Sequence, residues 1–140
     1  MKKLTAVICI ILSLFLIVGI IGARYIRSER KTENDNFIYA AKNIAYEIGE
    51  YIETGEKEYF LRAAADVTQM NSIAGTAENT VSEENAKILE KLSSVLEYNP
   101  EKLISEAQRL KDAFEIIAEN GKDTDYAYAQ IQIALTDSGL

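Results

Sequence analysis

The sequence predicts an all-α protein, in which a single N-terminal transmembrane helix is followed by an antiparallel bundle of four or five helices. Three observations predict this fold class. Residues 4–23 contain no charged side chain, and as a helix they match the roughly 20 residues that cross a bilayer core. Apolar residues from Phe37 onward recur at alternating spacings of four and three. Short breaks at Gly55, Asn99-Pro100 and Asn120-Gly121 force consecutive helices to lie side by side.

The apolar segment at residues 4–23 has two interpretations, an uncleaved anchor and a cleaved secretory signal peptide. Met1, Lys2 and Lys3 make the charged start that a signal peptide needs. However, the apolar run exceeds the roughly 7 to 15 residues of a signal-peptide core, and no Ala-x-Ala step precedes a cleavage site. Basic residues also follow at once, at positions 24, 27, 30 and 31. We therefore expect residues 1–31 to be a membrane anchor with a basic flank.

The orientation of the anchor depends on which basic residues stay in the cytoplasm. The four basic side chains after the span outnumber Lys2 and Lys3, which favours a cytoplasmic C-terminal domain. The short Met-Lys-Lys start, common among bacterial exported chains, favours the opposite orientation. We expect a single-pass protein of the cell membrane with an extracytoplasmic domain, and the other orientation stays open.

Charge and cysteine content exclude several classes of partner. Residues 1–31 carry six basic and one acidic residue, whereas residues 32–140 carry nine basic and 21 acidic residues. An acidic domain repels phosphate backbones, so nucleic acid is not an expected partner, while the basic flank suits anionic lipid headgroups. Cys9 is the only cysteine, which rules out a disulfide within the chain and a thiol cluster for a metal.

The domain at residues 32–140 begins with two predicted helices and a tight turn. The first helix ends at Gly55, where glycine can adopt a left-handed conformation, and Glu56 and Glu58 place negative charge in the first turn of the second. The alternative is a single helix that continues through Gly55, since one glycine only weakly destabilises a helix. The apolar positions of the two helices are Phe37, Ala41, Ile44, Ile48 and Tyr51, then Ala63, Val67, Met70, Ala74 and Ala77.

A third and a fourth helix are predicted from capping residues. Thr80 with Glu83 makes a capping box at the start of the third helix. Asn99 and Pro100 end that helix and start the fourth, because proline suits the first helical position after an Asn cap. Asn120-Gly121 ends the fourth helix. The apolar positions are Ile88, Leu89, Leu92, Val95 and Leu96, then Leu103, Ala107, Leu110, Phe114 and Ile117.

The last segment, DYAYAQIQIAL at residues 125–135, fits both a helix and a strand. Its apolar residues alternate strictly, which suits one face of a strand, but they also fit a helix capped by Asp123 or Thr124. We expect a helix, because no second segment could pair with a strand and an unpaired strand leaves its backbone groups unsatisfied.

Residues that commonly carry chemistry are scarce, and we predict no catalytic, cofactor-binding or metal-binding residue. The chain has no histidine and no P-loop, dinucleotide-binding or nucleophile-elbow pattern. Asp123 and Asp125 lack the rest of a calcium-loop spacing and are expected at a helix start. A group of glutamates could hold a divalent cation but is better explained as a solvated helix face. These are Glu47, Glu50, Glu53, Glu56 and Glu58.

The first helix of the domain carries apolar residues on more than one side. Tyr39 and Tyr46 lie seven residues apart, opposite the main apolar positions, and Ile38, Ala45 and Ile52 widen the apolar face. Either the segment at 125–135 packs on these residues, or they form a surface for a partner.

A homodimer is one candidate use of such a surface. Gly19 and Ala23 have the small-x-x-x-small spacing that lets membrane helices approach closely, and Ile38, Ala45 and Ile52 could continue the contact. The polar stretch at residues 27–36 argues against one continuous dimer contact from the membrane span into the first helix of the domain.

The stretch YIETGEKEYFLRAAADV at residues 51–67 resembles a pattern of extracellular four-helix-bundle sensor domains of bacterial receptors, Tyr-Leu-x-Thr-Gly-Asp-x-x-Tyr-Leu. Tyr51, Thr54, Gly55, Tyr59 and Phe60 carry the resemblance. It implies a helical bundle but transfers no ligand-binding residue, and the 140 residues hold no second span or output domain.

These observations predict a non-enzymatic interaction or structural module that is anchored in a membrane and has an unidentified protein partner. The alternative is an extracytoplasmic ligand-sensing bundle without its own output domain.

The anchor is tested by fractionation of cells that express the full chain. We expect the protein to stay with membranes through an alkaline wash and to enter solution only with detergent, because residues 4–23 have no charge to favour water. A soluble or secreted protein, or a mature chain that begins after Ala23, would contradict the anchor.

Overall fold

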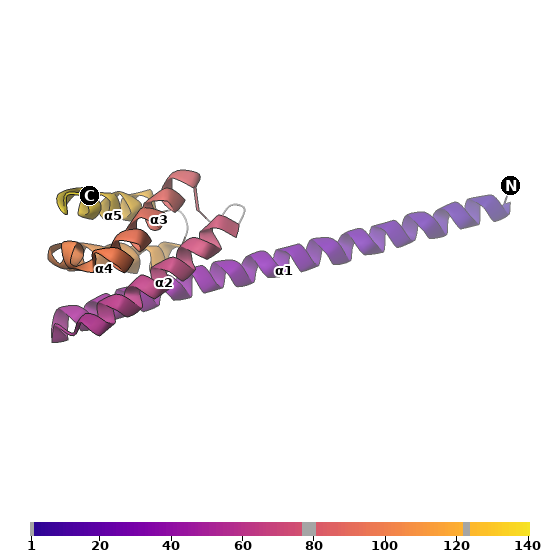
Figure 1. Cartoon of the computed structure of the whole chain (residues 1–140). Helices are drawn as coiled ribbons and strands as arrows, with labels where there is room; N and C mark the ends of the chain where they lie inside the picture. The colour runs from indigo at the N-terminus through magenta and orange to yellow at the C-terminus, as the bar shows by residue number, and fades with distance from the viewer. Residues whose placement is uncertain (1, 77–80, 122–123) are drawn as a thin grey trace. The chain divides into compact units, whose positions relative to one another are not determined.

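The computed structural model describes residues 2–76, 81–121 and 124–140, and the chain divides into two compact units. The N-terminal unit is Met1–Thr32 and the helical unit is Glu33–Leu140 (Figure 1). All regular secondary structure in the described residues is helical, which confirms the all-α prediction. The elements are α1 (Lys2–Thr54), α2 (Lys57–Thr76), α3 (Glu83–Tyr98), the 3₁₀ helix η1 (Pro100–Glu106), α4 (Ala107–Asn120) and α5 (Asp125–Asp137).

Helix α1 begins in the N-terminal unit and continues through the polar stretch at residues 27–36, with no break before Thr54. By length and composition α1 is able to cross a membrane, and a signal sequence near the N-terminus passes the same test. The apolar part of α1 is not buried by other described residues. Large apolar side chains such as Leu12, Phe15 and Val18 are exposed.

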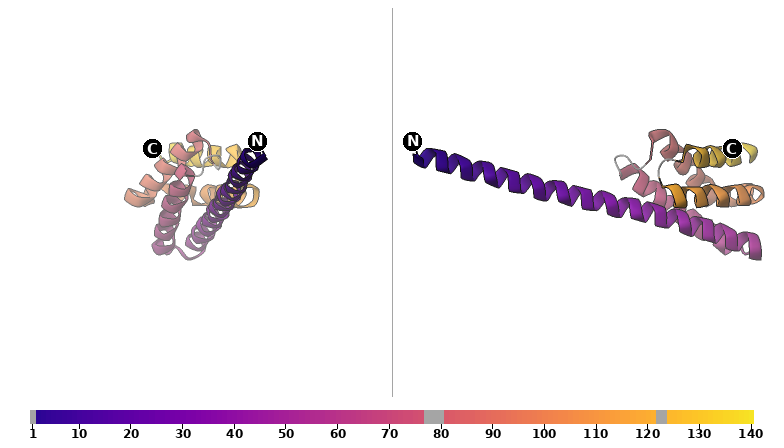
Figure 2. Two further views of the ribbon diagram at one scale, coloured as in Figure 1. Left: turned by 90° about the vertical axis from the view of Figure 1, so that its right-hand side faces the viewer. Right: turned by 180° about the vertical axis from the view of Figure 1, so that it is seen from behind.

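The turn between α1 and α2 confirms that YIETGEKEYFLRA contains two helices. Gly55 has a φ of 72°, a left-handed conformation that favours glycine, and its N–H donates to the Tyr51 carbonyl at 2.8 Å. The Thr54 hydroxyl accepts from the Glu56 N–H at 3.1 Å. After the turn, α2 runs back alongside the end of α1 (Figures 1 and 2).

One apolar core joins the helices of the helical unit. Helix α2 packs on α3 and α4 packs on α5, while α5 also contacts α3 (Figures 1 and 2). The core takes in the apolar positions expected from the helical spacing, apart from Tyr51 and Ile88, which are half-buried, and Ala77, which lies outside the described residues. The largest completely buried side chains include Phe37, Ile44, Ile48, Met70, Leu89, Leu92, Leu96, Leu103, Leu110, Phe114, Ile117 and Tyr128.

The predicted cap of α3 is wrong. Ser82 is the N-cap, and its hydroxyl accepts the Asn85 N–H at 3.2 Å, while Thr80 lies outside the described residues. Serine is the better N-cap residue of the two, and Ser82, two positions after Thr80, directly precedes the first helical residue, Glu83.

The segment after Pro100 differs from the predicted α-helix. Residues Pro100–Glu106 form the 3₁₀ helix η1, and the α-helical α4 begins only at Ala107. The Asn99 side chain makes no capping hydrogen bond, although the Lys102 N–H donates to the Asn99 carbonyl at 3.1 Å. Tighter i to i+3 turns of this kind are frequent at helix starts, and here they place Leu103 in the core.

Residues 125–135 belong to a helix, α5, as expected. Ala127, Ile131 and Ala134 are buried, whereas Ala129 and Ile133, which would share the same strand face, are exposed. Thr124, one of the two predicted caps, is the N-cap residue, but its side chain makes no capping hydrogen bond and its hydroxyl instead donates to the Gly121 carbonyl at 3.2 Å. Asp123, the other predicted cap, lies outside the described residues.

Two glycines of α1 and its turn should respond oppositely to alanine. Gly55→Ala should lower the free energy of unfolding by about 1 kcal/mol, because a Cβ strains the left-handed conformation. Gly49→Ala should raise it by up to about 1 kcal/mol, since alanine favours a helix interior and the new Cβ meets only the movable end of Lys111, 3.2 Å away. Urea denaturation of the full chain in lipid nanodiscs, followed by circular dichroism, measures both. Equal effects of the two substitutions would contradict the assigned turn.

Candidate functional site

The exposed side of α1 within the helical unit carries two aromatic side chains. Tyr39 is 65% and Tyr46 is 64% exposed, while Ala45 is buried and Ile38 is half-buried. The expectation that residues 125–135 cover this side is therefore wrong for both tyrosines: it is the smaller Ala45 that enters the core. Two tyrosines on one helix face leave large amphipathic rings available to a partner.

A groove runs beside Tyr46, between α1 and α4. Its volume is about 560 Å³, and Gly49 lies in its lining beside the Lys111 side chain. The Lys111 ammonium pairs with Glu115 at 2.6 Å on its own helix, and this hydrogen bond raises the pKa of Lys111. The lining residues are Lys42, Ala45, Tyr46, Gly49, Glu50, Glu53, Lys111, Glu115, Ala118 and Glu119.

A smaller and more apolar pocket lies where α1, α2 and η1 meet. The rings of Tyr51 and Phe60 contact each other with centroids 4.9 Å apart and planes tilted by 56°. The pocket volume is about 150 Å³, and its lining is almost wholly apolar. Its walls are formed by Tyr51, Lys57, Phe60, Leu61, Pro100, Glu101 and Ile104.

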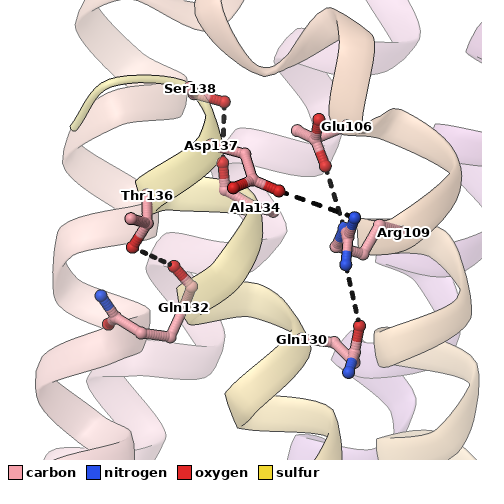
Figure 3. Close-up of polar contacts among 8 residues, drawn as sticks. All are labelled: Glu106, Arg109, Gln130, Gln132, Ala134, Thr136, Asp137 and Ser138. Carbon is pink, nitrogen blue, oxygen red and sulfur yellow. Dashed lines mark hydrogen bonds and ion pairs between the residues drawn. The ribbon is translucent and has the colours of Figure 1, made fainter.

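Arg109 links η1, α4 and α5 through three polar contacts (Figure 3). Its Nε donates to Glu106 at 2.9 Å, another guanidinium nitrogen donates to Gln130 at 3.2 Å, and a third lies 3.7 Å from Asp137. A shallow groove of about 440 Å³ runs past this arginine. Since the guanidinium already contacts three side chains, one from η1 and two from α5, we assign Arg109 a structural role.

Among the described carboxylates, Glu47 has the most strongly shifted pKa. Burial, and then the neighbouring Asp66 of α2, raise the pKa of Glu47 to about 7. Arg62 opposes this shift but pairs with Glu58 at 2.5 Å on its own helix. One oxygen of Glu47 is buried and has no hydrogen-bond partner among the described residues. Burial also raises the pKa of Asp66.

Two buried polar side chains, Ser93 and Asn85, form hydrogen bonds between helices. The hydroxyls of Thr68 and Ser93 are 2.7 Å apart across α2 and α3, and the Asn85 amide donates to Asp125 at 3.3 Å across α3 and α5. Burial and the nearby Asp125 raise the pKa of Tyr128, whose hydroxyl has no partner in the described part of the chain. Tyr128 is therefore a neutral core side chain at physiological pH.

The glutamates that the sequence offered as cation ligands have different neighbours in the structure. Glu50 and Glu53 line the groove and Glu58 pairs with Arg62, while Glu47 interacts electrostatically with Asp66 and Arg62 of α2. Asp125 accepts from Asn85 at the start of α5. Within residues 2–76, 81–121 and 124–140, no group of three or more such side chains is arranged to hold a metal ion.

Sequence reasoning missed the apolar pocket altogether. Its members come from three elements that are distant in the chain, and only the spacing of Tyr51 and Phe60 about the Gly55 turn could have indicated two facing rings.

Comparison of the chain with protein-family models, with curated proteins and with solved structures gave no match. The site is therefore interpreted from its own geometry.

The raised pKa of Glu47 predicts a specific pH dependence of stability. The folded chain keeps a proton on Glu47 up to about pH 7, whereas an unfolded glutamate releases it near 4.5. The contribution of Glu47 to stability is therefore full below pH 4.5 and is lost as pH rises through 7. Glu47→Gln should be more stable than the natural chain at pH 8, by about 1 kcal/mol after allowance for solvent screening, and the difference should vanish near pH 4.5.

Urea denaturation of the full chain at pH 4.5 and pH 8 measures this difference. Glu84→Gln, on the exposed side of α3, controls for removal of one carboxylate and should change stability by less than about 0.5 kcal/mol. A Glu47→Gln chain that is less stable at pH 8 would show that the carboxylate has a favourable partner.

Proposed function

We propose that the chain is a membrane-anchored, non-enzymatic helical bundle that binds a protein partner through α1. The observation that supports this function is the exposure of Tyr39 and Tyr46 on a helix whose opposite side is completely buried. Tyrosine gives a large contact area at low cost in conformational entropy, and its hydroxyl tolerates water when the partner is absent.

The groove beside Tyr46 supports the same proposal. A partner helix or loop laid along α1 would contact Tyr46 and enter the groove formed with α4. The polar rim of that groove, with glutamates on both helices, matches the usual arrangement of apolar anchors within a polar border. The core of the helical unit is complete without such a partner, so binding can be reversible.

Residues 4–23 hold this module at the bilayer in our proposal, with Arg24, Arg27, Arg30 and Lys31 at the headgroups of anionic lipids. We propose a single-pass protein of the cell membrane with the helical unit on the extracytoplasmic side. Confinement to a surface raises the effective concentration of partners in the same membrane. This favours weak and specific contacts.

A ligand-sensing bundle is the second candidate function. The pocket walled by Tyr51, Phe60 and Ile104 favours it, because concave apolar sites with a few charged groups are typical of small-molecule binding. A thermal-shift screen of the full chain in nanodiscs against a varied small-molecule library tests this candidate, since a specific ligand raises the melting temperature by mass action.

Photocrosslinking tests the primary proposal. A benzophenone amino acid is placed singly at Tyr39, Tyr46, Tyr98 or Tyr126 of the full chain in native membranes; the last two are exposed tyrosines of α3 and α5 and serve as controls. Adducts of one defined mass should form at positions 39 and 46 and not at the controls. An adduct of twice the chain mass identifies a homodimer as the partner. Equal yields at all four positions would refute an interface on α1.

A further inference from the structure

We propose that the pocket between α1, α2 and η1 binds a small zwitterion with an apolar group, such as a free α-amino acid with a branched or aromatic side chain. The inference rests on the second candidate function and identifies its ligand class. Three properties of the pocket support it: its size, its aromatic wall, and the opposite charges on its rim.

The size and lining fit one apolar group. A cavity of about 150 Å³ is the size that holds a benzene ring. Tyr51 and Phe60 supply a rigid aromatic wall because their rings brace each other at 4.9 Å, and Pro100 adds a side chain with little freedom to lose. A leucine or phenylalanine side chain would therefore fill the pocket, whereas a larger ring system would not.

The pocket leaves apolar surface in water. Leu61 is 54% and Ile104 is 38% exposed, and they lie on different walls of the same pocket. Neither side chain belongs to the buried core, which includes their neighbours Phe60 and Leu103. A bound apolar group would remove part of both side chains from water, which is the main source of affinity for a ligand of this size.

The rim carries one positive and one negative side chain. Lys57 begins α2 and Glu101 follows Pro100 in η1, so the two charges belong to different walls. Among the described residues neither has an ion-pair partner, unlike Glu58, Lys87 and Lys111, which pair within their own helices. A ligand carboxylate suits Lys57 at the positive start of α2, and a ligand ammonium suits Glu101. Both charges occur together on an α-amino acid.

Titration of the full chain in lipid nanodiscs tests this inference, with the methyl groups of Leu61 and Ile104 observed by NMR. Nanodiscs are chosen because detergent tails could themselves enter an apolar pocket. L-leucine and L-phenylalanine should shift both methyl signals in a saturable manner. Three related compounds, each without one feature, should bind at least about fivefold more weakly: 4-methylpentanoate, 3-methylbutylamine and glycine.

Exposed-site variants separate the contributions of the rim and the pocket. Lys57→Gln and Glu101→Gln should each weaken leucine binding about fivefold, whereas Lys102→Gln, an exposed neighbour outside the pocket, should leave it unchanged. Leu61→Trp should abolish binding by filling the pocket, with circular dichroism confirming the fold.

Absence of any methyl shift, equal binding of leucine and 4-methylpentanoate, or indifference to both rim variants would overturn the inference. If the library screen yields a ligand of other chemistry while leucine and phenylalanine fail, the sensing function stands and this ligand class falls.

Discussion

The buried face of α1 is the contact on which the helical unit depends. Phe37, Ala41, Ile44 and Ile48 lose all exposure to solvent, and each large side chain among them contributes about 1.5 to 3 kcal/mol when it leaves water. They share one cluster with residues of every other helix of the unit. Helix packing of this kind explains why a chain with few polar links between helices forms one core.

Polar contacts within the unit select an arrangement more than they stabilise it. The hydroxyl pair of Thr68 and Ser93 and the contact of Asn85 with Asp125 connect helices that apolar burial alone could pack in several registers. Arg109 has the same effect on η1, α4 and α5. Most ion pairs within single helices are exposed and contribute little to stability. Glu47 opposes folding at neutral pH, because one of its oxygens is buried without a hydrogen-bond partner among the described residues.

The two surfaces proposed for function arise from the same helix end. Tyr39 and Tyr46 face away from the core because the positions between them are used for packing, while Tyr51 turns inward against Phe60 once the Gly55 turn brings α2 back. One helix can therefore carry an aromatic surface for a macromolecule and an aromatic wall for a small molecule. The second use requires η1, since Pro100, Glu101 and Ile104 close the pocket.

The sequence by itself determined the helical character, the turns at Gly55 and Gly121, and most of the core, because these follow from local spacing and from the conformational freedom of glycine. It also indicated the helical state of residues 125–135, since no other segment could pair with a strand. The spacing of the sequence did not distinguish the cap at Ser82 from one at Thr80, or the 3₁₀ turn after Pro100 from an α-helix. Tertiary structure alone decided the exposure of Tyr39 and Tyr46. The exposure of a side chain depends on which helices pack against it, and the spacing of residues within one helix does not determine this. The apolar pocket also depends on tertiary structure: its lining residues extend from Tyr51 to Ile104, and only folding places the start of η1 against the α1–α2 turn.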